Sequence, residues 1–271
     1  MKNIFIYQEK GEGPVNEDVC GCAGQFAWVI DGATDVFKRN CLFEKDEVCK
    51  YVNCLNSTIE DLACNYQANQ LEILVKDAVS YVFRKLEIDK KAKNTPEYML
   101  PTYAMAMVAA EGEKLYYFIL GDCFISFQYD NKIELLIDKR ITEFSKRNRK
   151  LIKEYYEKNK RMPESLTIYQ DTRSKANAPD GYPIGSVRGS GIPQALSGTI
   201  QMRMGQRFIV CSDGFLDYFR LNGENNKNFF HLRSLHKEIF SMKAFLSDEE
   251  QYKAEMRPKK IDDCTFMLME V

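Results

Sequence analysis

The chain has 271 residues, of which 45% are hydrophobic and 28% are charged, as in an ordinary folded globular protein. Its 38 basic and 39 acidic residues give a formal net charge of −1, so no global basic field exists to attract nucleic acid. No apolar run reaches the roughly 20 residues that span a bilayer, and the charged N-terminal stretch is not typical of a signal peptide. Nine cysteines without zinc-type spacing favour buried, reduced thiols and a cytoplasmic location.

The first third of the chain is predicted to contain two strands and two helices. Residues 3–7 and 26–30 are short, β-prone apolar runs. Apolar residues then recur at helical spacing from about 42 to 64 and from about 71 to 86. We therefore expect strands followed by a helical pair.

The middle of the chain has the pattern of antiparallel strands. Short apolar runs are separated by turn residues, and they lie at 103–108, 115–120, 124–129 and 133–137. This pattern predicts a meander in which each strand pairs with the next.

The last part of the chain returns to mixed elements. Residues 138–161 are strongly charged with helical spacing, which predicts a solvated helix. Residues 171–193 are rich in Gly, Pro, Ser and Asn and predict a long, mobile loop. Two strands, a helix and a final strand are expected at 196–202, 208–211, 234–256 and 262–270. With no linker or repeat, residues 1–271 are predicted to form one α+β domain.

Acidic residues occur at the ends of several predicted strands. They are Glu17, Asp18, Asp31, Asp122, Asp213 and Asp262. Singly, each is explained by turn chemistry, because Asp-Gly is a common turn dipeptide, and we expect Asp180-Gly181 to be only a turn. Together, clustered carboxylates repel one another unless cations neutralise them. Oxygen ligands of this kind suit Mg²⁺ or Mn²⁺, and two such ions roughly 3.5–4 Å apart can activate water for attack on a phosphoryl group.

Other catalytic schemes find little support in the sequence. The two histidines, His231 and His236, are expected to be surface or packing residues. No motif of a serine hydrolase, a P-loop or a dinucleotide site is present, and the Gly-rich residues 185–191 are only a weak candidate for a phosphate cradle.

Five short motifs, in order along the chain, resemble those of the metal-dependent protein phosphatase family of the protein phosphatase 2C type, in its bacterial form. The motifs are Asn16-Glu17-Asp18, Val29-Ile30-Asp31-Gly32, Leu120-Gly121-Asp122-Cys123, the stretch from Val210 to Asp217, and Asp262-Asp263-Cys264-Thr265. They extend from residue 16 to residue 265, which is nearly the whole chain.

The resemblance implies a four-layer α-β-β-α sandwich of two antiparallel sheets flanked by helices, with a variable flap within about 138–195. It implies that Asp31, Asp213 and Asp262 are the catalytic metal ligands, with Asp31 bridging two Mn²⁺ or Mg²⁺ ions. The further implied metal-site residues are Gly32 through its carbonyl, Glu17 and Asp18 through water, and Asp122 and Asp217 at a weaker third site.

The implied activity is Mg²⁺- or Mn²⁺-dependent hydrolysis of phosphoserine and phosphothreonine in proteins by a metal-bound hydroxide. The implied partners are a phosphorylated protein substrate and a cognate Ser/Thr kinase, with no nucleic acid and no membrane.

Two positions depart from the family pattern. Gly13 stands where the family has an arginine that grips phosphate, for which Lys10 and Arg188 are candidate substitutes. Ala33 stands where many members have a histidine that donates a proton, and losing such an acid slows turnover by about 10²–10⁴-fold. These departures motivate an alternative function, a weak or inactive phosphatase-like regulatory or binding module. A third interpretation is that the Asp-Gly dipeptides are only turns.

Overall fold

Two antiparallel sheets form the centre of the protein in a computed structural model, which describes residues 1–129, 132–160, 167–216, 219, 223–246 and 262–271. The first sheet has the order β1 (Lys2–Glu9), β11 (Cys264–Glu270), β10 (Arg207–Cys211), β6 (Phe124–Tyr129) and β7 (Lys132–Ile137). The second has the order β2 (Asp18–Ala23), β3 (Phe26–Ala33), β4 (Thr102–Glu111), β5 (Lys114–Leu120) and β9 (Leu196–Gln201). A short strand, β8 (Gly185–Ser186), pairs with β4.

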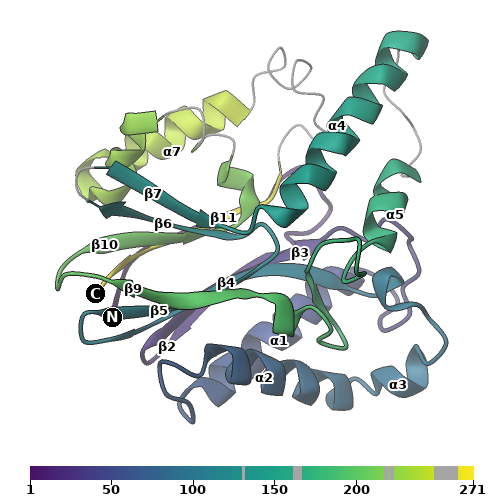
Figure 1. The fold of residues 1–271 in the computed structure, drawn as a ribbon, viewed down its shortest axis with the longest axis horizontal. Coiled ribbons are helices and arrows are strands. Elements are labelled where there is room, and N and C mark those ends of the chain that lie inside the picture. The colour runs from purple at the N-terminus through teal and green to yellow at the C-terminus, as the bar shows by residue number, and fades with distance from the viewer. Residues whose placement is uncertain (130–131, 161–166, 217–218, 220–222, 247–261) are drawn as a thin grey trace.

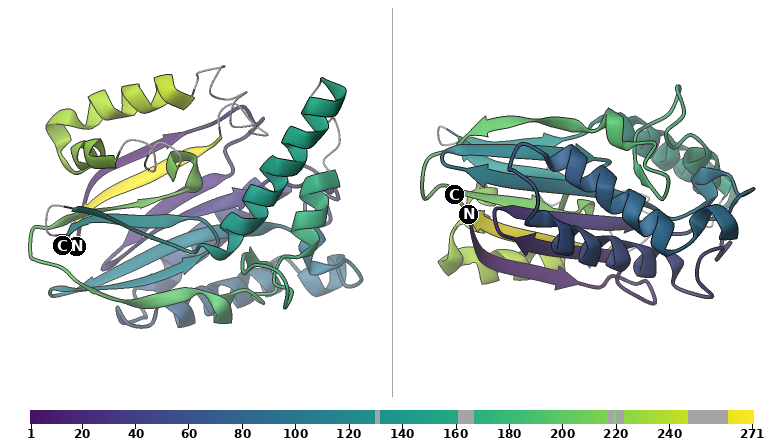
Figure 2. Two further views of the ribbon diagram at one scale, coloured as in Figure 1. Left: turned by 45° about the horizontal axis from the view of Figure 1, so that its top comes forward. Right: turned by 90° about the horizontal axis from the view of Figure 1, so that it is seen from below.

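Helices cover both outer faces of the two sheets (Figure 1). The helices α1 (Glu47–Ala63) and α2 (Leu71–Lys85) lie against the second sheet, followed by α3 (Ile88–Lys91) and the 3₁₀ helix η1 (Glu97–Met99). On the first sheet lie α7 (Leu232–Leu246) and the 3₁₀ helix η4 (Gly223–Phe230). The turned views in Figure 2 show the same succession of layers. The predicted four-layer α-β-β-α sandwich is therefore confirmed.

The sequence of β4 explains why the middle of the second sheet is buried on both faces. On β4, Ala104, Ala106 and Val108 pack between the two sheets, whereas the alternate residues Met105 and Met107 pack toward α1 and α2. This alternation follows from the two-residue period of a strand. Small side chains between the sheets let them approach closely, and the large ones fill the layer under the helices.

The predicted meander is wrong at one point, because the chain changes sheets between β5 and β6. The pair β4–β5 belongs to the second sheet, and the pair β6–β7 belongs to the first. The change occurs over Gly121, Asp122 and Cys123. Gly121 has φ 81°, and a Cβ on it would lie 2.7 Å from Ala104 Cβ, so a larger residue would not fit. Asp122 is thereby placed in the passage between the two sheets.

The segment 138–195 contains more structure than its composition indicated. The charged helix is confirmed as α4 (Arg140–Asn159), which projects from the sandwich beside α5 (Thr167–Ser174) (Figure 1). The prediction of a long loop over 171–193 is wrong, because α5 occupies its start and β8 and the 3₁₀ helix η2 (Ile192–Gln194) occupy its end. Its apolar residues, which include Tyr182, Ile184 and Val187, are buried.

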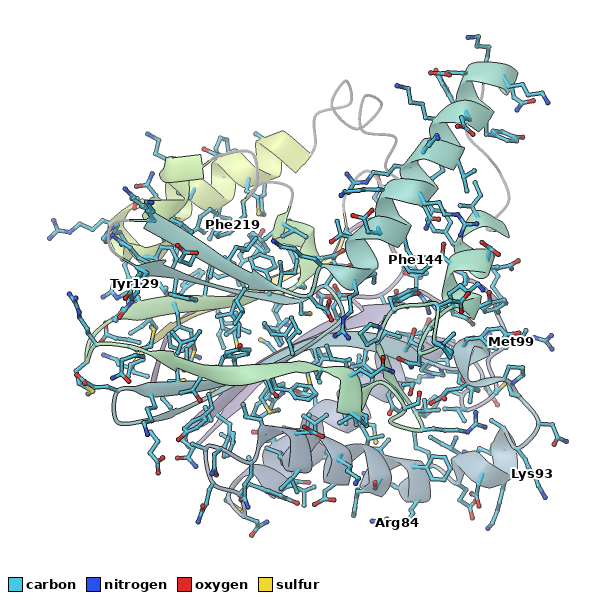
Figure 3. The ribbon with its side chains drawn as sticks, viewed as in Figure 1. Arg84, Lys93, Met99, Tyr129, Phe144 and Phe219 are labelled. Carbon is cyan, nitrogen blue, oxygen red and sulfur yellow. The ribbon has the colours of Figure 1, made fainter. Side chains whose placement is uncertain are left out.

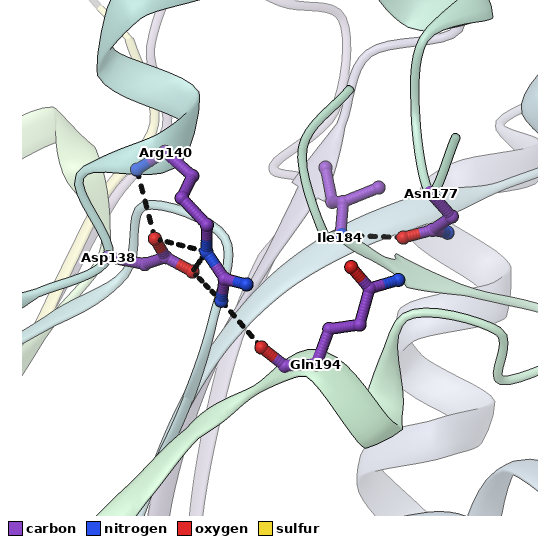
Figure 4. Close-up of polar contacts among 5 residues, drawn as sticks. All are labelled: Asp138, Arg140, Asn177, Ile184 and Gln194. Carbon is purple, nitrogen blue, oxygen red and sulfur yellow. Dashed lines mark hydrogen bonds and ion pairs between the residues drawn. The ribbon is translucent and has the colours of Figure 1, made fainter. Parts of the chain in front are cut away.

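A single arginine joins the two ends of this segment (Figure 4). Arg140 Nε donates to both carboxylate oxygens of the buried Asp138 at 3.0 Å, and its Nη2 donates to Oδ2 at 2.6 Å. The same Nη2 donates to the carbonyl oxygen of Gln194 at 2.5 Å. Further along the segment, Ile184 N donates to Asn177 Oδ1 at 2.9 Å. The segment therefore leaves and rejoins the sandwich at one place.

The last helix of the chain is described only in part. The helix expected over 234–256 is described as α7 up to Leu246, and residues 247–261 lie outside the described part of the chain. All nine cysteines are free thiols, but only Cys123, Cys211 and Cys264 are buried, so the expectation of general burial is wrong. Among the described helices, none combines the length and the apolar character needed to cross a bilayer.

Candidate metal centre

Two aspartates face each other across neighbouring strands at one end of the sandwich. Asp18 begins β2 and is the antiparallel partner of Asp31 on β3. The backbone pairing continues beyond them, since Gly32 N donates to Glu17 O at 3.0 Å. Asp31-Gly32 was expected to end its strand, but β3 runs on to Ala33. This Asp-Gly dipeptide is therefore not a turn.

Gly32 is required by close packing of the backbone. A Cβ on Gly32 would lie 2.7 Å from the carbonyl oxygen of Glu17 and 2.6 Å from Val48 Cγ1. Both distances are shorter than real contacts of a Cβ atom, so any other residue would push β2 or α1 away. The glycine thus keeps Glu17 and Asp18 close to Asp31.

The first sheet brings further acids to the same end. Asp213 begins the short 3₁₀ helix η3 (Asp213–Phe215), two residues after β10 ends at Cys211. Asp262 was expected to begin the last strand, but β11 starts two residues later at Cys264. The Asp122 of the passage between the sheets also reaches this end. Asp217 lies outside the described residues.

The electrostatics show that these acids are close neighbours. Burial raises the pKa of Asp31 well above its usual value, and the charges of Asp18, Asp213, Asp122 and Asp262 raise it further. Burial likewise raises the pKa of Asp213, with Asp122 and Asp262 as the next causes. Five acids from both sheets therefore act on one another.

Asp18 is the best-defined member of the group. Burial raises its pKa to about 7, with Asp263 and Asp262 adding to the rise and a hydrogen bond from Ser212 opposing it. Ser212 Oγ donates to Asp18 Oδ2 at 2.7 Å, whereas Asp18 Oδ1 is buried and has no hydrogen-bond partner. A buried carboxylate oxygen without a partner is costly in a folded protein. It is the kind of atom that a cation would satisfy.

The donor set fits a hard divalent cation. The group supplies only carboxylate and carbonyl oxygens, which are the ligands of Mg²⁺ and Mn²⁺. In the described part of the chain, no three His, Cys, Asp or Glu side chains already surround a common point at binding distance.

Glu17 is placed differently from the aspartates. Its carboxylate Oε2 accepts a hydrogen bond from Thr34 Oγ1 at 2.8 Å. Glu17 therefore lies over the end of β3, tied to the residue that follows Ala33.

Two structurally important residues were not given roles from the sequence. Ser212 is completely buried, and besides binding Asp18 it accepts a hydrogen bond from Thr265 N at 2.9 Å. Asp263 accepts hydrogen bonds from the backbone N–H groups of Gly11 and Glu17, both at 2.7 Å. These contacts hold β2 and the loop before it against the start of β11. Both residues lie inside the sequence motifs, and each is next to a predicted metal ligand. That position is the feature of the sequence from which a role in the site could have been predicted.

The weaker candidates from the sequence have structural explanations. Arg188 donates to the carbonyl oxygens of Ala92 and Thr95 at 3.1 and 3.3 Å, so it ties the Gly-rich stretch to the end of α3. Lys10 is exposed, and its Nζ donates to Gly13 O at 2.5 Å. His236 packs edge-on against Phe5 on the outer layer, as expected of a packing residue.

Solved structures with the same fold include serine/threonine phosphatases. The catalytic domain of the serine/threonine phosphatase PstP, in complex with two manganese ions, matches with a TM-score of 0.59 at 11% identity over 98% of this chain and 96% of that one. PppA of Pseudomonas aeruginosa matches with a TM-score of 0.58 at 12% identity over 97% and 95% of the two chains. The PPM phosphatase MsPP of Mycobacterium smegmatis, in complex with cacodylate, gives the same TM-score and identity over 98% and 97%.

No family model matches the sequence, and no curated protein matches it. The likeness therefore rests on the structure. At 11–12% sequence identity it shows the fold alone. The chain has the fold of the bacterial PPM-type Ser/Thr phosphatases over nearly its whole length. This agrees with the resemblance of its motifs.

Proposed function

We propose that this protein is a Mg²⁺- or Mn²⁺-dependent phosphatase that hydrolyses phosphoserine and phosphothreonine in proteins. The observation that carries the proposal is the like-charge pair of the buried Asp18 and the half-buried Asp31 on adjacent strands, joined by Asp213 from the other sheet. Like charges directly opposite in a sheet are destabilising. A fold retains such a pair at a net cost unless a cation binds between them.

The residues divide into roles by position. We propose that Asp31 contacts both ions, that Gly32 offers its carbonyl oxygen, and that Asp213 and Asp262 hold the second ion. Glu17 and Asp18 would act through water, and Asp122 and Asp217 at a weaker third position. When bound, the ions would lower the pKa of water and neutralise the phosphoryl charge. Ser212 keeps the Asp18 carboxylate oriented, and Thr34 does the same for Glu17.

The shared fold supports this assignment. PstP and MsPP are serine/threonine phosphatases, and PstP binds manganese. The phosphoprotein substrate, a cognate kinase and a cytoplasmic location are predictions that follow from the proposed activity.

A metal-dependent assay tests the proposal. The purified protein should hydrolyse p-nitrophenyl phosphate and a phosphothreonine peptide with Mn²⁺ or Mg²⁺, and EDTA should abolish both activities. Asp213→Asn should lower kcat/KM by at least the ~10–100-fold that even outer partners of a metal site cost. Asp180→Asn is the matched control, because Asp180 lies in an exposed turn and its carboxylate pairs with Lys175, away from the acidic cluster.

The result also separates the proposal from the alternative module. A regulatory or binding module would show no turnover with either ion, and Asp213→Asn would leave its affinity for a partner unchanged. Absence of hydrolysis across Mn²⁺ and Mg²⁺ concentrations would refute the phosphatase.

A further inference from the structure

Arg173 is a half-buried cation that α5 places against the end of β3. Its Nη1 donates to Thr102 Oγ1 at 2.6 Å and lies 3.5 Å from the carbonyl oxygen of Ala33. Its Nη2 lies 3.5 Å from the carbonyl oxygen of Thr34. Ala33 and Thr34 directly follow Asp31 and Gly32 in the chain. The segment 138–195 thus delivers a guanidinium group to the edge of the acidic cluster.

The same guanidinium also faces the passage between the two sheets. Burial raises the pKa of Tyr182, the charge of Arg173 and a hydrogen bond from it oppose that rise, and the charge of Asp122 adds to it. Arg173 and Asp122 therefore act on one buried hydroxyl group. The side chain of Arg173 is accordingly bracketed by the end of β3 on one side and by Tyr182, the neighbour of Asp122, on the other.

The hydrogen bonding of Arg173 leaves capacity for a ligand. A guanidinium has five N–H donors, and here one makes a short bond to Thr102 and another bonds the Tyr182 hydroxyl, while the two carbonyl contacts are at the outer limit of hydrogen bonding. Its planar fork matches two oxygens of a phosphate group. A phosphate dianion that approaches a cluster of carboxylates needs such a positive partner.

Two other candidates for this role are less suitable. The guanidinium of Arg188 is bound to the carbonyl oxygens of Ala92 and Thr95, near the end of α3. Lys10 is exposed and supplies a point charge without the fork geometry. Arg173 combines partial burial, anchoring by Thr102 and contact with the strand that carries Asp31.

We infer that Arg173 binds the phosphate group of the substrate, from the flap side of the site, at a position that compensates for Gly13. This inference rests on the proposed phosphatase function. Thr102 fixes the guanidinium, so Arg173 can meet the phosphate without ordering a free side chain. The affinity for phosphate then depends on how α5 sits against the sandwich.

The test compares two arginines of the same segment. Arg173→Met and Arg188→Met both remove a guanidinium that contacts backbone carbonyls, but only the first should affect phosphate. We expect Arg173→Met to raise the Kd of inorganic phosphate for the Mn²⁺-loaded protein by about 10–100-fold, the usual effect of losing one charged hydrogen-bond partner. The Kd is measured by calorimetry, and the KM for p-nitrophenyl phosphate should rise in parallel. Arg188→Met should change the thermal midpoint only.

Arg173→Lys provides the second variant if Arg173→Met does not fold. It keeps the charge but loses the fork, so it should weaken phosphate binding less than Arg173→Met and more than Arg188→Met. An unchanged Kd in a folded Arg173 variant, or equal losses in the Arg173 and Arg188 variants, would overturn the inference.

Wild-type turnover reports separately on the proposed function. Phosphate binding that depends on Arg173 in a protein without turnover would support the inference and refute the phosphatase. Wild-type protein that binds no phosphate in the presence of Mn²⁺ would overturn the inference, whatever its turnover.

Discussion

The two ends of the sandwich carry different cross-strand pairs of charged residues. At the end where Figure 3 labels Tyr129, Arg207 on β10 is the direct partner of Glu270 on β11, and their charged groups lie 3.0 Å apart. At the other end, Asp18 on β2 is the direct partner of Asp31 on β3. One position holds opposite charges and the other holds like charges.

The difference indicates that one end stabilises the sheet and the other binds a ligand. An opposite-charge pair stabilises a sheet by itself, whereas a like-charge pair opposes it. Arg207 also donates to Phe230 O at 3.0 Å, so its donors serve the fold. The aspartates instead act on one another across both sheets, which is the arrangement expected of a cation site.

The largest effect is expected from a change of pH in the absence of metal. Asp18 has a pKa of about 7 in the folded protein, while an unfolded aspartate ionises near pH 4. Between those values the folded state binds more protons, so the stability of the metal-free protein should fall as pH rises from about 4 through about 7. The loss approaches about 1.4 kcal/mol per pH unit for each such proton. Thermal melting in EDTA at pH 6 and pH 8 measures it.

Added Mn²⁺ should reverse this trend. Because the ion binds the deprotonated acids, its stabilisation should increase with pH, reaching about 2.7 kcal/mol at a concentration 100 times Kd. Asp31→Asn serves as control, since it removes one of the charges and should flatten the pH dependence. A metal-free protein that melts higher at pH 8 than at pH 6 would contradict the prediction.

A smaller effect is expected from Ser212→Ala at the acidic end. The change removes the donor to Asp18 Oδ2 and the acceptor of Thr265 N, both of which are buried. We expect a loss of about 2–3 kcal/mol in the free energy of unfolding, measured by urea denaturation in EDTA. Ser80→Ala is the control, because Ser80 is only half-buried and its hydroxyl bonds Lys76 O within α2. Equal losses in the two variants would show that Ser212 has no special place in the cluster.

The smallest effect is expected at the opposite end, from Glu270→Gln. The ion pair with Arg207 is partly exposed, at 26% and 30% of the side-chain surface, so solvent screens it. We expect less than about 1 kcal/mol of destabilisation, which 1 M NaCl should abolish, and unchanged kcat/KM. A loss of activity would mean that the two ends are coupled.

Local periodicity was enough to predict most helices and strands. The helices α1 and α2 follow from regularly spaced apolar residues, and β3 and β10 from compact β-prone runs. The change of sheet at Gly121–Cys123 could not be predicted, because a tight turn between sheets has the same local composition as a hairpin turn. The loop predicted at 171–193 failed for a related reason. Its glycines are there for close packing, as Gly185 shows by lying against the ring of Tyr103.

The candidate site was predictable only where acids stand in sequence motifs. The positions of Asp31 and Asp213 could be inferred, and the structure brings them together with Asp18, Asp122 and Asp262. The role inferred for Arg173 could not be predicted, because it depends on contacts with residues 71 and 140 positions away in the chain. Such contacts leave no local pattern.

The contact of Arg140 with Asp138 and Gln194 has a consequence for how this protein can vary. The guanidinium holds together the end of β7, at the edge of one sheet, and the start of β9, at the edge of the other. Since both ends of the intervening chain are fixed at one point, a change in its length adds only a small closure entropy and need not displace either strand. The length of this segment can therefore vary without moving the strands that carry the acids, provided that its buried residues Tyr182, Ile184 and Val187 are kept.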